Sequence, residues 1–339
     1  MMDESFIPYR LAAAFIKQKL EDSGQPQPTI GVICGSGLSG LSSALEGDTL
    51  TIKYGEIPGF PAHCTVVGHK GEVVFGMLSG VPTMCFRGRF HSYEGHDMKT
   101  VVLPVLVMRC LCVKMLLVTN AAGGLNPEYN VGDVCCISDY VALPQLAGKN
   151  PLVGINDDEL GPRFPPTSNA FPDNLREAAA QAAKDLNMSF VRPSGSCYCF
   201  VSGPMYESRA ECKLLRSVGG DAVGMSTIPE VLTAHYGGMK VLGLSLITNK
   251  VIIEGDEGPA ASHAEVLEAV GKRANQMQGL VQQIVKILNQ DIIPGLPDLP
   301  PVNLEVPKPM FWGLPVKKLV TAVALVAVGA MLGSKMAKR

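Results

Sequence analysis

The chain has 339 residues, of which 47% are hydrophobic and 18% charged, and its formal net charge is −2. This composition supplies a sizeable core and argues against disorder over most of the length. A nucleic-acid-binding protein would need a basic excess, which this chain lacks. The length fits one large domain or two ordinary ones.

Ten cysteines are present, but none of them form a C-x-x-C pair, and several lie in apolar runs. This usage favours reduced, buried cysteines in an intracellular compartment over a zinc site or a disulfide framework. Residues 11–16 are apolar, but Lys17 and Lys19 follow closely, which is typical of an amphipathic helix rather than a signal peptide. We therefore expect a cytoplasmic protein without a bound metal.

Apolar runs and turn signals predict strands that alternate with helices along the chain. The predicted strands are Thr29–Cys34, Val73–Leu78, Pro82–Arg87, Lys114–Thr119, Asp133–Ser138, Ser196–Ser202 and Val241–Thr248. The predicted helices are Lys99–Cys112, Asp173–Leu186, Glu207–Val218, Pro229–Tyr236 and His263–Leu288. The second and third strands read as a hairpin, and Leu143–Phe171, rich in Pro, Gly and Asn, as a long functional loop. This alternation predicts one α/β domain with a mixed, twisted β-sheet flanked by helices.

A glycine motif, Gly35-x-Gly37-x-x-Gly40, follows the first predicted strand. It matches the dinucleotide-binding pattern, which also expects a second strand ending in an acidic residue about 20 positions later. Residues 54–59 occupy that region, and their Pro and Gly interrupt a strand. A structural turn and a dinucleotide site remain alternatives, but we favour an anion cradle in which exposed amides and the Ser36 hydroxyl donate hydrogen bonds.

Further polar residues follow the other predicted strands. In Arg89-x-His91-x-Tyr93, an extended backbone would place all three side chains on one side, with the Arg89 fork suited to phosphate; an exposed edge strand is the alternative. Residues 119–124 contain two alanines and two glycines, which predicts a loop whose backbone approaches a ligand closely. Asn249 ends a strand, where an amide is well placed to bind a ligand or to form a turn.

Three other candidates have simple structural alternatives. Glu207, beside Tyr206, is either a carboxylate that accepts from the N1–H of a purine or an acid in the first turn of a helix. His263 starts the last long predicted helix, and His69 lies between glycines; each could be an ordinary surface residue.

Taken together, these motifs resemble the trimeric purine nucleoside phosphorylases. The resemblance runs from about Ile30 to about Asn289 and rests on Gly35-Ser36-Gly37, Arg89–Gly95, Thr119–Pro127, Gly224-Met225-Ser226 and Thr248-Asn249-Lys250. It implies purine salvage by phosphorolysis, in which phosphate attacks C1′ of a purine nucleoside and releases the base and ribose 1-phosphate. No metal or organic cofactor is implied; inorganic phosphate is the co-substrate.

The resemblance also implies a role for each matching residue. Asn249, His91, His263 and Glu207 are expected to be the catalytic residues. Phosphate would be held by Ser36, Arg89, His91, Ser226, the backbone N–H of Ala121 and His69. Ribose would contact Tyr93, Met225, His263, Tyr206 and Phe164, and the base Glu207, Asn249, Val223 and Gly123. Phe164 would reach the site of a neighbouring subunit, so that a homotrimer forms the catalytic unit.

The pair of Glu207 and Asn249 favours 6-oxopurine nucleosides, inosine and guanosine, over adenosine. Tyr206 departs from the phenylalanine usual in vertebrate relatives, which bears on the choice between ribose and deoxyribose. Two alternatives stay open: a catalytically weak purine-binding or scaffolding relative, and a nucleotide-dependent oxidoreductase resting on the Gly35 motif.

The C-terminal region differs in character. We expect a phosphorylase domain over 1–290, a Pro-rich linker over 291–312 and an apolar helix over 313–339. Residues 319–333 carry no charge, and lysines flank them on both sides. As a helix they span roughly 22 Å, short of the bilayer core, although the lysines could extend this length. The alternatives are an anchor in an intracellular membrane facing the cytosol, a helix docked on the enzyme, and an extension without function.

Overall fold

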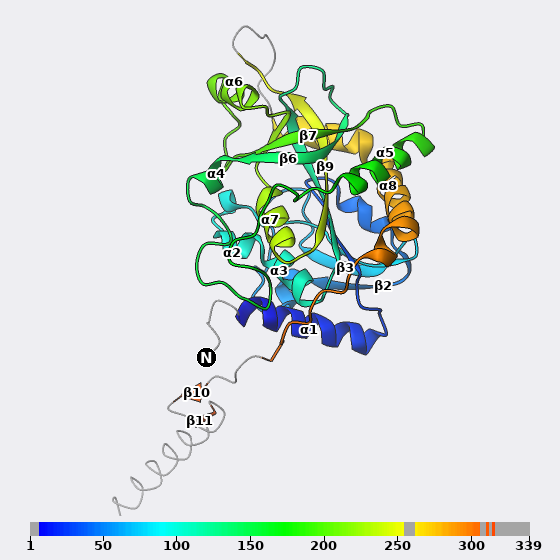
Figure 1. Ribbon diagram of the computed structural model, residues 1–339, viewed down its shortest axis with the longest axis vertical. Helices are drawn as coiled ribbons and strands as arrows, with labels where there is room; N and C mark the ends of the chain where they lie inside the picture. The colour runs from blue at the N-terminus through cyan, green and yellow to red at the C-terminus, as the bar shows by residue number, and fades with distance from the viewer. Residues whose placement is uncertain (1–6, 254–261, 306–309, 312–313, 316–339) are drawn as a thin grey trace, which may run out of the picture.

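The computed structural model describes residues 7–253, 262–305, 310–311 and 314–315. Within these residues, one β-sheet runs through the body of the molecule and helices cover both of its faces (Figure 1). Helices α1, α3 and α7 pack with the sheet in one hydrophobic cluster, and helices α5 and α8 in a second. The predicted single α/β domain with a mixed sheet flanked by helices is therefore confirmed.

The bounds of the elements follow in chain order. The strands are β1 Ile30–Ile33, β2 Glu46–Lys53, β3 Glu72–Leu78, β4 Val81–Phe86, β5 Met115–Gly124, β6 Val134–Ala142, β7 Val191–Phe200, β8 Ala222–Gly224, β9 Lys240–Lys250, β10 Met310–Phe311 and β11 Leu314–Pro315. The α-helices are α1 Ile7–Ser23, α2 Met98–Val101, α3 Leu103–Cys110, α4 Leu143–Leu146, α5 Asp173–Asp185, α6 Arg209–Ser217, α7 Ile228–Tyr236 and α8 His263–Asp291. Short 3₁₀ turns are η2 Ser39–Ala44, η3 Tyr54–Glu56, η4 Ser92–Glu94 and η5 Ile293–Gly295.

The strand order explains where a site can form. In the described residues the main sheet runs β2-β3-β4-β1-β5-β8-β7-β6-β9, and β9 also pairs with β5, which closes the strands from β5 to β9 into a ring. Strand β1 is parallel to β4 and β5, and β5 is parallel to β9. The carboxyl ends of these four strands therefore meet at one edge, where ligands bind in open α/β sheets.

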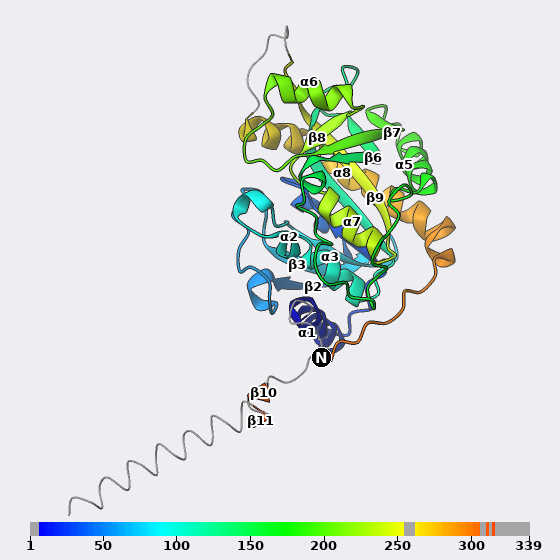
Figure 2. The same cartoon turned by 60° about the vertical axis from the view of Figure 1, so that its left-hand side comes forward.

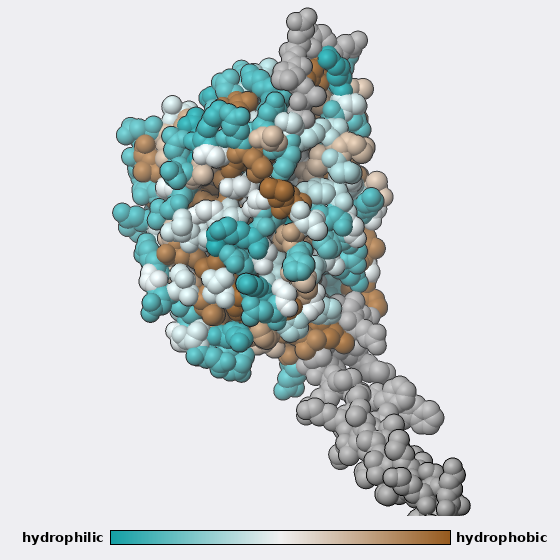
Figure 3. Space-filling model, turned by 180° about the vertical axis from the view of Figure 1, so that it is seen from behind, coloured by the Kyte–Doolittle hydropathy of each residue, from teal (hydrophilic) through white to brown (hydrophobic). Residues whose placement is uncertain are grey.

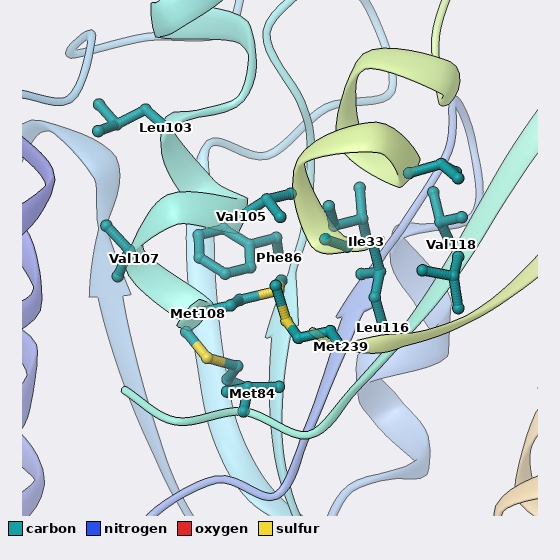
Figure 4. Packing of buried hydrophobic residues seen from close by; sticks show 14 of the residues in the cluster. Ile33, Met84, Phe86, Leu103, Val105, Val107, Met108, Leu116, Val118 and Met239 are labelled. Atoms are coloured by element: carbon teal, nitrogen blue, oxygen red, sulfur yellow. The ribbon is translucent and has the colours of Figure 1, made fainter. Parts of the chain in front are cut away.

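Successive side chains of the central strands point alternately into the two hydrophobic clusters. Ile33, Leu116 and Val118 point to the side of α3 and α7, while their chain neighbours Val32 and Leu117 join the opposite cluster. Figure 4 shows the first cluster from close by, with the methionines of β4 and α3 packed beside Phe86. The outer surface mixes apolar and polar patches on the face seen in Figure 3.

Several predicted elements need correction. The helix predicted over Lys99–Cys112 is two helices that meet at Val102, because Pro104 lacks an N–H and fits the first turn of a new helix. Strands β2 and β8 were not predicted: β2 is mostly exposed and β8 has three residues. The hairpin of β3 and β4 is confirmed, and Ser79 and Gly80 both adopt positive φ in its turn, as a type I′ turn requires.

The glycine motif after β1 leads into the 3₁₀ turn η2 and then into β2, which pairs antiparallel with β3. A dinucleotide site would require an α-helix to open at this loop, with its N-terminus on the pyrophosphate. The dinucleotide-binding alternative is therefore wrong.

Beyond α8, the chain returns along the body as an extended strap over residues 296–305. Lys114 pairs with Asp298 at 2.7 Å, Arg109 Nη1 donates to Pro300 O at 2.9 Å, and the strap amide of Asn303 donates to Glu159 at 3.0 Å. Val302 is buried. The strap ends beside α1, at the end of the molecule opposite α6 (Figures 1 and 2).

The start of the predicted linker thus packs on the body, while the predicted domain boundary at residue 290 stays a prediction. The apolar helix predicted over 313–339 lies outside the described residues, except for 314–315. Among the residues that the structure describes, none belong to a helix long and apolar enough to cross a membrane.

Candidate active site

A cavity of about 360 Å³ opens at the sheet edge where β1, β4, β5 and β9 end. Thirteen of the fifteen residues predicted for the site line it: Ser36, Arg89, His91, Tyr93, Ala121, Gly123, Tyr206, Glu207, Val223, Met225, Ser226, Asn249 and His263. They come from segments far apart in the sequence. Only the folding of the sheet brings these segments together.

One end of the cavity is cationic. Arg89 follows β4 and is 3% exposed; its Nη1 donates to Ser226 Oγ and its Nη2 to Thr119 O, both at 3.0 Å. The third nitrogen, Nε, donates to Glu230 Oε1, also at 3.0 Å. The guanidinium is thus fixed in its plane beside the Ser226 hydroxyl, an arrangement suited to the oxygens of a phosphate.

Ser36 lies opposite, in the turn after β1. Gly35 N donates to Thr119 Oγ1 at 3.0 Å, and a Cβ at Gly35 would lie 2.7 Å from Asn120 Cα. Glycine is therefore required for β1 and β5 to approach each other closely here. The anion-cradle interpretation is supported in this respect, although residues 119–124 are part of strand β5 and not the predicted loop.

His69 does not line the cavity but supports Ser36 from behind. His69 Nδ1 lies 2.9 Å from Arg89 N and 3.3 Å from Arg89 O, and His69 Nε2 lies 3.2 Å from Ser36 Oγ. Burial, together with the nearby His91 and Arg89, lowers the pKa of His69 to about 3. A neutral His69 therefore orients the Ser36 hydroxyl.

His91 is held by an acid that sequence reasoning missed. Glu94 Oε1 accepts from His91 N at 3.0 Å and from His91 Nδ1 at 2.9 Å, while Glu94 Oε2 accepts from Thr65 N at 3.0 Å. Burial lowers the pKa of His91, against the effect of Glu94. With Nδ1 occupied, Nε2 is the ring nitrogen left for a ligand. The only sequence signal was an acid three residues after His91.

The Glu94 carboxylate should make stability depend on pH. Burial opposes its charge, but hydrogen bonds from His91 and Thr65 outweigh this effect and lower its pKa to about 2. A depressed pKa means that the stabilisation is complete above the unfolded value near 4.5 and is lost as pH falls towards 2. We expect Glu94→Gln to lower the free energy of unfolding by about 1–3 kcal/mol at pH 7.

Chemical denaturation at pH 7 and at several values between 4.5 and 2 checks this expectation, because the gap between wild type and variant should shrink as pH falls. The matched control is Glu268→Gln: Glu268 is an exposed helix acid paired with Lys272, and it should contribute little. A difference in the free energy of unfolding between wild type and Glu94→Gln that stays constant across this pH range would contradict the stabilising role of the Glu94 carboxylate.

The residues predicted for the base also line the cavity. Asn249 is the last residue but one of β9, and its Oδ1 lies 3.3 Å from Thr248 Oγ1, so the oxygen side of the amide faces the strand. A Cβ at Gly123 would lie 3.1 Å from Val251 Cγ1, 3.3 Å from Val223 Cγ1 and 3.4 Å from Asn249 Nδ2. Glycine therefore lets these side chains pack closely around β5 at this point of the cavity wall.

Glu207 is a half-buried carboxylate that lines the same cavity. Helix α6 begins at Arg209, and its N-cap is Ser208, whose N–H donates to Glu211. The helix-acid alternative for Glu207 is therefore wrong, because Glu211 has that role. Burial raises the pKa of Glu207, as expected for a carboxylate without a fixed cation beside it.

The cavity is also lined by the residues predicted for the ribose, Tyr93, Tyr206, Met225 and His263. The Tyr93 ring stacks on His91 with centroids 4.5 Å apart. Tyr93 belongs to η4, so the predicted extended geometry of Arg89, His91 and Tyr93 is wrong beyond His91, although all three residues face the cavity. His263 is the first residue of α8, as predicted.

Phe164 is the one predicted residue far from this cavity. It is 86% exposed and lines a different hollow, of about 610 Å³, with Leu146 and Val153. Within this single chain it therefore belongs to an exposed apolar surface on the loop after α4.

Sequence reasoning missed seven residues that line the cavity: Val66, Val67, Ala122, Pro204, Gly224, Thr248 and Val266. Most are small or apolar and carry no chemical signature. Across the described residues, no three His, Cys, Asp or Glu side chains are grouped to hold a metal ion.

Comparison with known proteins agrees with this geometry. The sequence matches the phosphorylase superfamily over residues 29–286. It is 46% identical over 268 residues to purine nucleoside phosphorylase of Bos taurus, an alignment that covers 79% of this chain and 90% of the bovine one.

Two solved structures of Schistosoma mansoni purine nucleoside phosphorylase are also similar. The complex with inosine has 42% identity and a TM-score of 0.76, and covers 82% of this chain and 95% of the other. The complex with adenosine has 40% identity and the same TM-score, and covers 82% and 96%. The chain therefore belongs to the phosphorylase superfamily and, within it, to the purine nucleoside phosphorylases.

Proposed function

We propose that this chain cleaves inosine and guanosine with inorganic phosphate, yielding the free base and ribose 1-phosphate, or the deoxyribose product from deoxynucleosides. One observation carries the proposal. Ser36, Arg89 and Ser226 line the same cavity as Glu207 and Asn249. Such a cavity can hold an anion and a purine at the same time, with a sugar between them.

The geometry suggests how each end contributes. Phosphate bound at Arg89 would attack C1′ while the glycosidic bond breaks, which leaves negative charge on the base. Asn249 Nδ2 is the free donor of its amide, since Oδ1 faces Thr248, and it would donate to purine N7 as this charge develops. Glu207 would accept from N1–H, and His263 would address the 5′-hydroxyl. No metal or organic cofactor enters the reaction.

Release of hypoxanthine from inosine tests the proposal, measured with and without phosphate. We expect turnover only with phosphate, and stoichiometric ribose 1-phosphate. Folded protein that binds hypoxanthine but shows no turnover would overturn the enzymatic proposal in favour of a purine-binding relative.

Adenosine is the informative competitor. Asn249 can donate to N7 and tolerate O6, and Glu207 needs an N1–H, which adenine lacks at neutral pH. We therefore propose a preference for 6-oxopurines, to be measured as the ratio of kcat/KM for inosine and adenosine. A related protein crystallises with adenosine, so comparable kcat/KM values would overturn the preference without affecting phosphorolysis.

We propose, as part of the same function, that the chain forms a homotrimer. Phe164, Leu146 and Val153 form an exposed apolar surface that a second copy of the chain could cover, delivering Phe164 to a neighbouring cavity. In a homotrimer, we expect Phe164→Ala to raise KM for inosine by about tenfold with little change in KM for phosphate.

Sedimentation and initial-rate kinetics check this expectation together. The matched control is Val131→Ala, an exposed apolar residue that lines neither hollow, and it should leave KM for inosine unchanged. A monomeric wild type with normal turnover would contradict the role of Phe164.

For the tail we propose a membrane anchor over residues 313–339 on a protein otherwise in the cytoplasm. Its uncharged segment with lysines on both flanks supports this proposal. The strap supports it too, since it brings the chain to residue 305 at the end of the body opposite α6. Loss of the membrane fraction on deleting 312–339 is expected; a full-length protein that stays in the supernatant would overturn it.

A further inference from the structure

Ser226 is presented to the cavity by an unusual turn. Thr227, the next residue, has φ 79° and ψ −53°, and Ile228 N donates to Ser226 O at 2.9 Å. These values define a γ-turn centred on a β-branched residue at positive φ, a conformation that such residues avoid. A strained residue of this kind persists only where its surroundings fix it.

Two buried groups fix the turn. Glu230 Oε2 accepts from Thr227 N at 2.8 Å, and Asn120 Nδ2 donates to Thr227 Oγ1 at 3.0 Å. Thr227 is fully buried and Glu230 is 2% exposed. Glu230 of α7 therefore holds the backbone of the turn, and Asn120 of β5 holds the side chain of Thr227.

The second oxygen of the Glu230 carboxylate binds Arg89, the predicted phosphate ligand. Glu230 Oε1 accepts from Arg89 Nε at 3.0 Å. Arg89 uses one N–H on each nitrogen for Glu230, Ser226 and Thr119. Within the described residues, this leaves two of the five guanidinium N–H donors for phosphate oxygens, one on Nη1 and one on Nη2.

From this geometry we propose that Glu230 is a positioning residue for phosphate, whose two oxygens hold the Arg89 guanidinium and the strained Ser226–Ile228 turn in one arrangement. The inference rests on the proposed phosphorolysis and adds a residue that does not line the main cavity. A carboxylate beside an anion site opposes the bound anion by its charge, so its placement here is explained by geometry rather than by attraction.

Charge and geometry predict opposite results for Glu230→Gln. Glutamine keeps the shape and one acceptor oxygen, but its NH₂ cannot accept the second hydrogen bond. Positioning predicts that KM for phosphate rises at least about tenfold while KM for inosine changes little. A charge effect alone predicts that KM for phosphate falls, which would overturn the proposal. A lower Tm with both KM values unchanged would assign Glu230 a structural role only, which also overturns it.

Glu230→Asp keeps the charge but shortens the reach, so positioning predicts a rise in KM for phosphate here too. The matched control is Glu211→Gln, because Glu211 accepts from the N-cap N–H of α6 as Glu230 accepts from that of α7, but forms no ion pair with an arginine in the described chain. Its KM for phosphate should not change.

Thr227→Gly leaves Glu230 itself unchanged and stays informative if the Glu230 variants fail to fold. Glycine adopts positive φ without strain, and its N–H can still donate to Glu230, but the Asn120 contact is lost. If Glu230 holds the turn, KM for phosphate should stay close to the wild-type value; a rise of about tenfold or more would mean that Asn120 and the Thr227 side chain hold the turn, which overturns the proposal. Wild type is assayed first, because absent turnover there refutes the phosphorolysis itself and not the role of Glu230.

Discussion

Replacing Asn249 with alanine should lower kcat/KM for inosine by about 100- to 1,000-fold, mainly through kcat. The reason lies in the orientation of the amide. Its Oδ1 faces Thr248 at 3.3 Å, and Asn249 lines the cavity, so Nδ2 is the side of the amide that can donate to a bound base. A donor placed where charge develops stabilises the transition state more than the bound substrate. Initial rates of hypoxanthine release at saturating phosphate measure the effect.

Two further variants separate donation from shape. Asn249→Asp keeps the size of the side chain but replaces the N–H donor with an acceptor, so its loss on inosine should approach that of the alanine variant. Lys250→Ala changes the next, exposed residue of β9, whose Nζ contacts Pro127 O at 3.4 Å, and should leave kcat/KM nearly unchanged. An aspartate variant with full activity would show that donation from residue 249 is unimportant.

Residue patterns predicted the framework of this site well where physical periodicity is strong. The buried strands β1, β4, β5 and β9 read as apolar runs, and a polar residue after a buried strand is forced to the sheet edge. The parallel pairing of these strands then brought Ser36, Arg89 and Asn249 to one cavity. The order of these motifs along the chain was enough to predict the site, because the pairing of the strands determines where their polar residues lie.

The supporting acids were not predictable in this way. Glu94 and Glu230 each sit three residues after the group they bind, His91 and Thr227, a spacing that any helix start shares. Their significance depends on burial and on a second partner from a distant segment, Thr65 for Glu94 and Arg89 for Glu230, which sequence spacing does not encode. Strand β8 has three residues and pairs with β5 and β7, so tertiary contacts rather than local pattern create it.

Replacing Arg89 with leucine should damage both activity and stability. Without the guanidinium, KM for phosphate should rise by about 100-fold or more, since a charge-assisted fork is lost. The free energy of unfolding should fall by about 3–5 kcal/mol, because Glu230 is left as an uncompensated buried charge. Phosphate-saturation kinetics and urea denaturation at fixed protein concentration measure the two effects.

The double variant Arg89→Leu, Glu230→Leu separates these effects. Removing both charges from a buried pair often costs little, so the double variant should regain much of the lost stability. Its activity should stay as low as that of the single variant, because neither the phosphate fork nor the link to the Thr227 turn is restored. Recovery of phosphate binding along with stability would mean that Arg89 serves the fold rather than the anion, and the cationic end of the cavity would have to be assigned elsewhere.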